Sequence, residues 1–319
     1  MSLYLTYDID EMKDGFGAQY LRVIGIYCLA KMIGAKYLHT TITEYEHLQQ
    51  DYWKKIEDHF GLATFKSRDV SSFDNIKSIK YPNNLNELKS NNYDKDTLIK
   101  ILLAVGILDK NPDDYDLIMD DLRKLKRNID LPEYDKSEKN IAIHIRRGDV
   151  NKDSTDRYTG NDHYIKVTQA LKTKYPKSPI FIFTEDSGDL DMFRQMDNVT
   201  LMCDLDVLLT FEYLCNADVL VTAKSCFSGV AGLYNTSSEI YVENTPTPKL
   251  SRHKYIDDLF NEPATESFTG LNAGMYTDNN YMLYIFSFLI FTFVGFFYFV
   301  SYKKKWIRRF FNKSFAKER

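Results

Sequence analysis

Short apolar segments alternate with amphipathic segments through the second half of the chain. Apolar runs bounded by polar residues predict strands at 140–145, 179–183, 199–202, 219–222 and 239–242. Apolar side chains at helical spacing predict helices between them, at 162–174, 189–196, 207–216 and 227–233. Strands separated by helices indicate a parallel, doubly wound α/β sheet, in which ligands bind at the carboxyl ends of the strands. We therefore expect Arg146, Thr184 and Ser225 at the ligand-binding edge.

The first half of the chain shows a less regular pattern. It predicts a strand at 3–7, a helix at 19–33 and an extended segment at 35–39. The charged, asparagine-rich region 51–130 predicts mostly helix, at 52–60, 95–107 and 115–128, with a strand around 76–79. Residues 131–133 interrupt the pattern and indicate a linker. We expect an α/β fold of two Rossmann-like lobes, at 1–135 and 136–260.

A long uncharged segment lies near the C-terminus. Residues 281–302 carry no charged side chain and are rich in Phe, Ile, Leu and Tyr, so they are long enough to span a bilayer core of about 30 Å. A linker at 261–280 precedes this segment, and a basic tail at 303–319 follows it. The pattern predicts a single-pass membrane protein with the lipid bilayer as a partner; the alternative is a buried helix.

The orientation of this predicted anchor depends on two opposing signals. The basic tail and the acidic upstream flank favour a cytosolic C-terminus, with the folded lobes outside the cytosol. The N-terminus, however, has neither a basic region nor a long apolar core, so no signal peptide is visible. A lone C-terminal anchor normally leaves the preceding domain in the cytosol. We favour cytosol-facing lobes over lumenal ones.

Composition narrows the function only slightly. The chain has 319 residues, 44% of them hydrophobic, and a net charge of −4, which gives no sign of nucleic-acid binding. Four cysteines lack the spacing of a zinc site, and buried free thiols are the expected state of Cys28 and Cys215. Asp204 and Asp206 have the spacing of a nucleotide-sugar metal site, but we expect no metal and no cofactor.

The segment 143–149, Ile-His-Ile-Arg-Arg-Gly-Asp, is the most informative part of the sequence. It places two arginines and a glycine at the end of a predicted strand, where planar guanidinium forks suit phosphate oxygens. The alternative is a structural ion pair, in which Asp149 or a remote acid neutralises Arg146 or Arg147. Chemistry alone leaves both interpretations open.

This segment resembles the signature of the fucosyltransferase superfamily, closest to its α1,2-fucosyltransferase (glycosyltransferase family 11-like) branch. Three further segments resemble that family in the same order. They are the glycine-rich opening at 14–19, the helix at 164–171, and the strand with its serine-containing loop at 217–228. The resemblance covers residues 4–245 and implies a GT-B-like fold and a metal-independent, inverting transferase. In such a fold, 1–135 would be the N-terminal, acceptor-side lobe and 136–260 the C-terminal, nucleotide-sugar-binding lobe. It also implies GDP-fucose as donor and a galactose-containing glycan as acceptor, joined by an α1,2 linkage.

The resemblance also implies roles for individual residues. Arg146 would hold the β-phosphate and stabilise the departing GDP, with Arg147 beside it in the catalytic pair, ordering the loop or a catalytic carboxylate. His144 would contact guanosine, although a structural histidine is the alternative. The remaining donor-binding residues would be Ser225, Cys226, Phe227 and Ser228, at a helix N-terminus that favours anions, and Gly15, Gly17 and Gln19. Helix capping and a simple turn are the alternatives for these two groups.

The chain departs from the family at several positions. Cys226 replaces the second serine of the family loop, and Ala18 stands where the family usually has Asn. Thr210 occupies the position of the acid that reads guanine, and a hydroxyl can make only one of that acid's two bonds. Asp206 or Glu212 would have to substitute for it. These departures leave open a different nucleotide sugar, a protein acceptor, or a non-catalytic, membrane-anchored glycan- or nucleotide-binding protein.

The catalytic base is not identified by spacing. Asp149 and Asp153 lie close to the arginines, as does Asp156, and Asp14 lies in the facing loop. A solvated loop carboxylate is the alternative for each of them, and we expect Asp149 to be structural.

Overall fold

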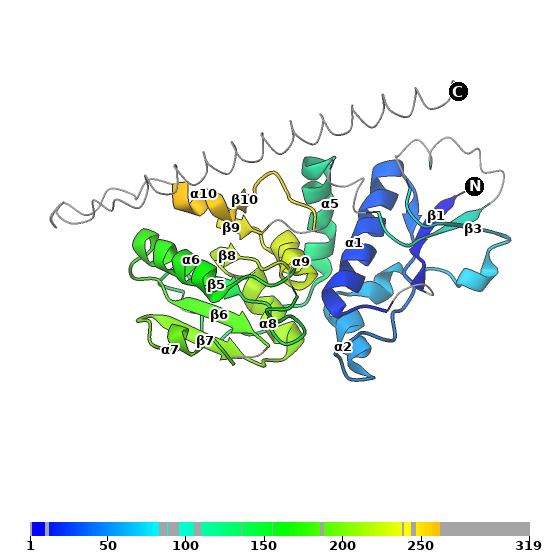
Figure 1. Ribbon diagram of the computed structural model, residues 1–319. Helices are drawn as coiled ribbons and strands as arrows, with labels where there is room; N and C mark the ends of the chain where they lie inside the picture. The colour runs from blue at the N-terminus through cyan, green and yellow to red at the C-terminus, as the bar shows by residue number, and fades with distance from the viewer. Residues whose placement is uncertain are drawn as a thin grey trace, which may run out of the picture. The chain divides into compact units, whose positions relative to one another are not determined.

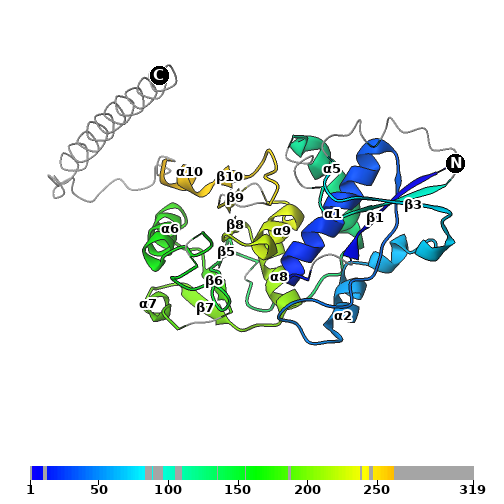
Figure 2. The ribbon, with the colours of Figure 1, turned by 45° about the vertical axis from the view of Figure 1, so that its right-hand side comes forward.

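The computed structural model describes residues 2–9, 13–82, 88, 96–104, 110–134, 136–154, 156–185, 188–237, 239–243 and 247–261. Residues 1–265 form one compact unit. It contains two parallel sheets with helices packed against them, so the predicted α/β class is confirmed. Figures 1 and 2 show the two sheets with α1, α8 and α9 between them.

The first sheet is built entirely from strands that precede residue 135. Its order is β2-β1-β4-β3, and every neighbouring pair is parallel. The strands are β1 (Leu3–Tyr7), β2 (Lys36–Tyr37), β3 (Asn75–Ile79) and β4 (Thr97–Ile101). The helices are α1 (Phe16–Ile33), α2 (Tyr52–His59) and α5 (Pro112–Leu125), with short 3₁₀ helices at Leu62–Phe65 and Val70–Ser72.

The second sheet is built from strands that follow residue 136. Its order is β10-β9-β8-β5-β6-β7, again parallel throughout. The strands are β5 (Ile141–His144), β6 (Ile180–Thr184), β7 (Val199–Cys203), β8 (Val219–Val221), β9 (Glu239–Val242) and β10 (Lys254–Tyr255). The helices are α6 (Asn161–Lys174), α7 (Asp191–Arg194), α8 (Val207–Cys215), α9 (Cys226–Tyr234) and α10 (Ile256–Asn261).

One prediction in the first sheet was wrong. The helix expected at 95–107 is instead β4, which pairs with β1 on one side and β3 on the other. Leu98 and Ile99 point to opposite faces of this inner strand, and both side chains are fully buried. A short apolar run buried on both faces cannot be distinguished from a helix by periodicity alone. Region 51–130 is therefore less helical than expected.

A hydrophobic core runs from one sheet to the other. Rings from α1, α2, α8 and α9 meet in it, among them Phe16, Tyr20, Phe60, Phe211 and Tyr234. The hydroxyls of Tyr20 and Tyr234 are 2.6 Å apart, which gives both buried groups a partner. This packing fixes α1 against α9, and so fixes the first sheet's loops near the ligand-binding edge of the second.

The predicted membrane anchor lies outside the described residues. Among the residues that the structure describes, no helix is both long and apolar enough to cross a membrane. The predicted segment 281–302 and tail 303–319, like the linker beyond Asn261, lie outside that part of the chain. The anchor and its orientation therefore stay predictions.

Candidate functional site

The arginine motif leaves the sheet at the end of β5, its central strand. Ile141, Ala142 and Ile143 are fully buried between β6 and β8, so the strand brings the residues that follow it to a fixed point. The Ile145 N–H continues the pairing by donating to the Phe183 carbonyl at 2.9 Å. Arg146 is therefore placed at the carboxyl edge of the sheet, where parallel sheets bind ligands.

Arg146 makes a forked contact with a carboxylate three residues later. Its Nε lies 3.1 Å from Asp149 Oδ1, and its Nη2 lies 2.5 Å from Asp149 Oδ2. Nη1 donates to the Lys224 carbonyl at 3.3 Å, which ties the guanidinium to the loop before α9. Both side chains remain partly open to solvent, 23% for Arg146 and 29% for Asp149. Arg146 thus lies beside the N-terminus of α9 and within reach of solutes.

Gly148 makes this forked contact possible. It has a φ of +80°, in the left-handed region that favours glycine. A Cβ at this position would also lie 2.6 Å from Glu185 Oε2, at the end of β6. Because the chain turns sharply here, Asp149 folds back onto Arg146.

Arg147 is held by the protein itself. Its guanidinium donates to the carbonyls of Arg146 at 2.8 Å and Thr159 at 3.2 Å, and to Asn161 Oδ1 at 2.5 Å. The ring of Tyr158 lies 4.5 Å from its Cζ. The side chain is only 7% exposed, so these contacts favour the loop-ordering role over direct contact with substrate.

His144, the last residue of β5, is buried two residues before Arg146. The residue is 8% exposed, and its Nδ1 has no hydrogen-bond partner among the described residues. Burial, reinforced by the charge of Arg146, lowers the pKa of His144 to about 3, so the ring is neutral. The ring packs edge-on against Phe227, with centroids 5.5 Å apart. A buried polar atom without a partner fits the predicted nucleotide contact.

The N-terminus of α9 receives capping from its own serines. Ser225 Oγ accepts from the Phe227 N–H at 3.2 Å, and Ser228 Oγ accepts from the Ala223 N–H at 3.1 Å. Ser228 is fully buried, so its hydroxyl serves the loop and not a ligand. Phe227 packs against Phe16, His144 and Phe211. In the predicted donor loop, the side chains of Ser225, Phe227 and Ser228 are thus engaged in contacts within the protein, and the partly buried Cys226 is the remaining predicted contact.

Gly17 brings α1 into backbone contact with α9. A Cβ on Gly17 would lie 2.3 Å from the nitrogen of Phe227 and 2.8 Å from the carbonyl carbon of Cys226. Gly15 differs, because a Cβ there would find only the Glu46 carbonyl oxygen, at 4.0 Å. Of the two glycines predicted to bind the donor, Gly17 therefore lies against α9, and Gly15 does not.

Gln19 lies in a buried polar cluster that the sequence analysis missed. Its Oε1 accepts from the Tyr7 hydroxyl at 2.5 Å and from Arg22 Nη1 at 3.1 Å. Arg22 Nη2 also forms an ion pair with Asp14. Gln19 is 1% exposed, so these contacts favour a structural role over the predicted sugar or phosphate contact. The sequence signal that could have indicated this cluster is Arg22 itself, a single arginine within the apolar helix pattern of 20–30.

Charges from both halves of the chain converge on Cys226. Arg146, Asp14 and Arg22 all act electrostatically on its thiol, whose pKa is raised, chiefly by burial. The start of α9 is therefore near Arg146, which is paired with Asp149, and near Arg22, which is paired with Asp14. Helix N-termini attract anions, and two nearby guanidinium groups add to that attraction.

The predicted guanine position has no carboxylate. Thr210 lies half-buried on α8. Asp206 caps that helix, accepting from the Leu208 N–H at 3.0 Å and from the Tyr52 hydroxyl at 2.7 Å. Glu212 is fully buried and pairs with Lys126 and, at 3.1 Å, with His59. Neither acid is placed to substitute for the missing one.

The candidate bases have different surroundings. Burial would raise the pKa of Asp149, but the hydrogen bonds and charge of Arg146 outweigh burial and hold it below its ordinary value. Asp153 and Asp156 are exposed loop residues. His47 lies near enough to act on Asp149 electrostatically and has a φ of +66°, which is uncommon outside glycine.

Two other observations on the described residues concern metal binding and cavities. No group of three or more His, Cys, Asp or Glu side chains there could hold a metal ion. A cavity of about 40 Å³ lies beside α9, lined in part by Thr222, Glu243 and His253. A volume of this size holds a few water molecules and not a nucleotide.

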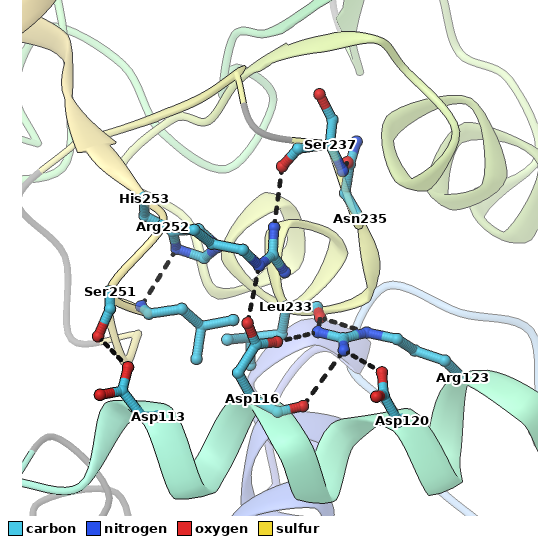
Figure 3. A network of polar contacts seen from close by, with 11 residues as sticks. Asp113, Asp116, Asp120, Arg123, Leu233, Asn235, Ser237, Ser251, Arg252 and His253 are labelled. Atoms are coloured by element: carbon cyan, nitrogen blue, oxygen red, sulfur yellow. Dashed lines mark hydrogen bonds and ion pairs between the residues drawn. The ribbon is translucent and has the colours of Figure 1, made fainter.

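The far end of α9 is tied to α5 by hydrogen bonds from Arg123 to a backbone carbonyl. Arg123 donates to the Leu233 carbonyl at 2.6 Å and to Asp116 Oδ1 at 2.5 Å. Figure 3 shows Asp116 between Arg123 and Arg252, whose Nε lies 2.9 Å from Asp116 Oδ2. α9 is therefore fixed at both ends, by Gly17 at its start and by Arg123 at its end.

Comparison with known proteins gives structural neighbours only. No protein-family model matches the chain, and no curated protein matches it. The chain is similar to the NodZ fucosyltransferase from Bradyrhizobium, with 13% identity, a TM-score of 0.42, and coverage of 76% of this chain and 96% of that one. It is also similar to POFUT1 in complex with GDP, with 10% identity, a TM-score of 0.43, and coverage of 80% and 98%.

A further neighbour is NodZ α-1,6-fucosyltransferase soaked with GDP-fucose. It shows 11% identity and a TM-score of 0.38, with coverage of 78% of this chain and 97% of that one. Scores this low do not establish a shared fold. The function is therefore best inferred from the motif and from the contacts described above.

Proposed function

We propose that the protein is a fucosyltransferase that moves fucose from GDP-fucose to a glycan hydroxyl. The observation that carries the proposal is the position of Arg146, held at the carboxyl end of β5 and bonded to the loop before α9. A guanidinium fork beside a helix N-terminus suits the diphosphate of a nucleotide sugar.

The proposed chemistry is an inverting displacement that needs no metal. Arg146 and the first turn of α9 would take up the negative charge that develops as GDP leaves. The buried, neutral His144 would meet the nucleoside through Nδ1. By the resemblance of its motifs, the acceptor would be a galactose-containing glycan and the linkage α1,2.

The proposed base is a loop carboxylate. An inverting transfer needs one group to accept the proton of the acceptor hydroxyl. Asp149, Asp153, Asp156 and Asp14 are the candidates, of which Asp149 and Asp14 are each paired with an arginine.

A second candidate function follows from Thr210. Because no carboxylate stands at the predicted guanine position, a transferase for a different nucleotide sugar is the alternative. A protein acceptor would use the same donor site. A binding protein without catalysis would retain nucleotide affinity alone.

Binding of GDP to the full chain in mild detergent, measured by calorimetry, tests the donor assignment. We expect wild-type protein to bind GDP and Arg146→Ala to lose that binding, with turnover falling by about two to three orders of magnitude. Lys152→Ala is the control, because it removes one exposed positive charge from the same loop. No binding of GDP by a folded wild-type chain would reject GDP-fucose, and a screen of UDP and other nucleotides would then decide between the two candidates.

A further inference from the structure

The fork of Arg146 already holds an anion from its own chain. Asp149 presents two oxygens to Nε and Nη2 at 3.1 and 2.5 Å. A carboxylate and a phosphate bind a guanidinium through the same pair of donors. The two anions therefore compete for one edge of Arg146.

The remaining donors of Arg146 are also directed by the protein. Nη1 is bonded to the Lys224 carbonyl, which holds the guanidinium beside α9 while Asp149 occupies its outer edge. Because both side chains are partly exposed, an incoming solute reaches that edge without unfolding the loop. Arg147 has its own partners and does not take Arg146's place.

Another cation, Arg157, lies near Asp149 when it leaves the fork, and the imidazole of His47 is close as well. His47 and Arg157 both lie close enough to act on it electrostatically. His47 belongs to the loop whose Glu46 N–H donates to the Asp14 carbonyl at 3.1 Å, so it comes from the opposite side of the site. Leaving Arg146 would therefore not leave the carboxylate without a countercharge.

We infer that Asp149 is an internal competitor on the phosphate-binding fork of Arg146, and that a diphosphate must displace it to bind. The inference rests on the proposed function only in taking a diphosphate as the ligand. Asp149 acts here through Arg146 and is a positioning residue.

The direction in which one substitution changes the affinity for diphosphate distinguishes this inference from a purely structural role of Asp149. If Asp149 competes with the ligand, Asp149→Asn should bind diphosphate more tightly, by roughly two- to five-fold, the range expected for a partly exposed ion pair. If Asp149 only holds Arg146 in place, the same variant should bind more weakly. Asp156→Asn removes a nearby exposed charge without touching Arg146, and so corrects for the change in net charge.

The experiment compares wild type, Asp149→Asn, Asp156→Asn, Arg146→Ala and the Arg146→Ala/Asp149→Asn double variant. Affinities for GDP and for inorganic pyrophosphate are measured by calorimetry on the full chain. We expect a gain in Asp149→Asn that exceeds that of Asp156→Asn and disappears when Arg146 is absent. Equal or weaker binding by Asp149→Asn, including no binding of either ligand, would overturn the inference.

Two ligands keep this test separate from the donor assignment. Tighter pyrophosphate binding by Asp149→Asn without any GDP binding would support competition at Arg146 and reject the guanine nucleotide. GDP binding with no gain in Asp149→Asn would support the donor and reject the competitor.

Discussion

The contact between Gly17 and α9 gives the sharpest structural prediction. Placing a Cβ on Gly17 brings it to 2.3 Å from the Phe227 nitrogen and 2.4 Å from its Cα. Both are backbone atoms of α9's first turn, so a side-chain rotation cannot relieve the contact. We predict that Gly17→Ser pushes α1 and the first turn of α9 apart.

The magnitude follows from two opposing effects. Overpacking a tight contact costs about 1–3 kcal/mol, while replacing glycine by serine within a helix gains about 0.5 kcal/mol. The net loss of unfolding free energy is then about 0.5–2.5 kcal/mol, which corresponds to a fall of roughly 1–10 °C in Tm for a domain of this size. Because the displaced turn carries the proposed anion site, GDP binding should weaken as well.

Gly15→Ser is the matched control in the same motif. Gly15 has a φ of −66° and a ψ of 164°, and the nearest atom to an added Cβ is 4.0 Å away. Serine is favoured at this position before a helix, so stability should stay near that of wild type or rise. Thermal unfolding and calorimetry on both variants would test the pair. Equal Tm and equal GDP affinity for the two variants would refute the close-approach argument.

Two further predictions concern buried charge. The pKa of His144 is about 3 in the fold and 6.5 in the unfolded chain, so the unfolded chain binds more protons between these values, and stability falls as pH drops through this window. His144→Gln should remove that loss, so its difference in unfolding free energy from wild type should narrow between pH 7 and pH 5 in urea titrations. Stability curves that run parallel over this pH range would contradict the prediction. Glu212→Gln should cost about 3–5 kcal/mol, because it leaves Lys126 and His59 buried without their carboxylate. Asp206→Asn, which can still cap α8, should stay within about 0.5 kcal/mol of wild type in the same denaturation assay.

The second sheet was predictable because its pattern is redundant. Each strand from β5 to β9 is an apolar run bounded by polar residues, and each is followed by a segment with helical spacing, except β9. In the first sheet, β4 lacks that support. Its apolar residues continue to Leu102 and Leu103, a length that also fits a helix, and only pairing with β1 and β3 settles the choice. β10 has two residues, too few for a periodic signal.

The candidate site was predictable in position but not in the partners of its residues. The sequence places Arg146, Ser225 and Gly17 near one another through topology and motif. It cannot show that Ser228 bonds to Ala223, or that Gln19 bonds to Tyr7, because those contacts depend on how loops fold back. Arg22 is the reverse case, since a charged residue inside an apolar helix face signals a buried partner, here Asp14.

The two adjacent arginines show why the choice between an anion site and a salt bridge could not be made from the sequence. The guanidinium of Arg147 is buried and donates its hydrogen bonds to groups of the protein, which agrees with the structural interpretation. Arg146 stays at the edge of the sheet, yet it too is paired, with Asp149. Under the proposed competition, the two interpretations of Arg146 would describe successive states of one group, because a partly exposed carboxylate can be exchanged for a phosphate at the same fork. The intramolecular pair also lowers the cost of keeping a cation at this position before the donor arrives.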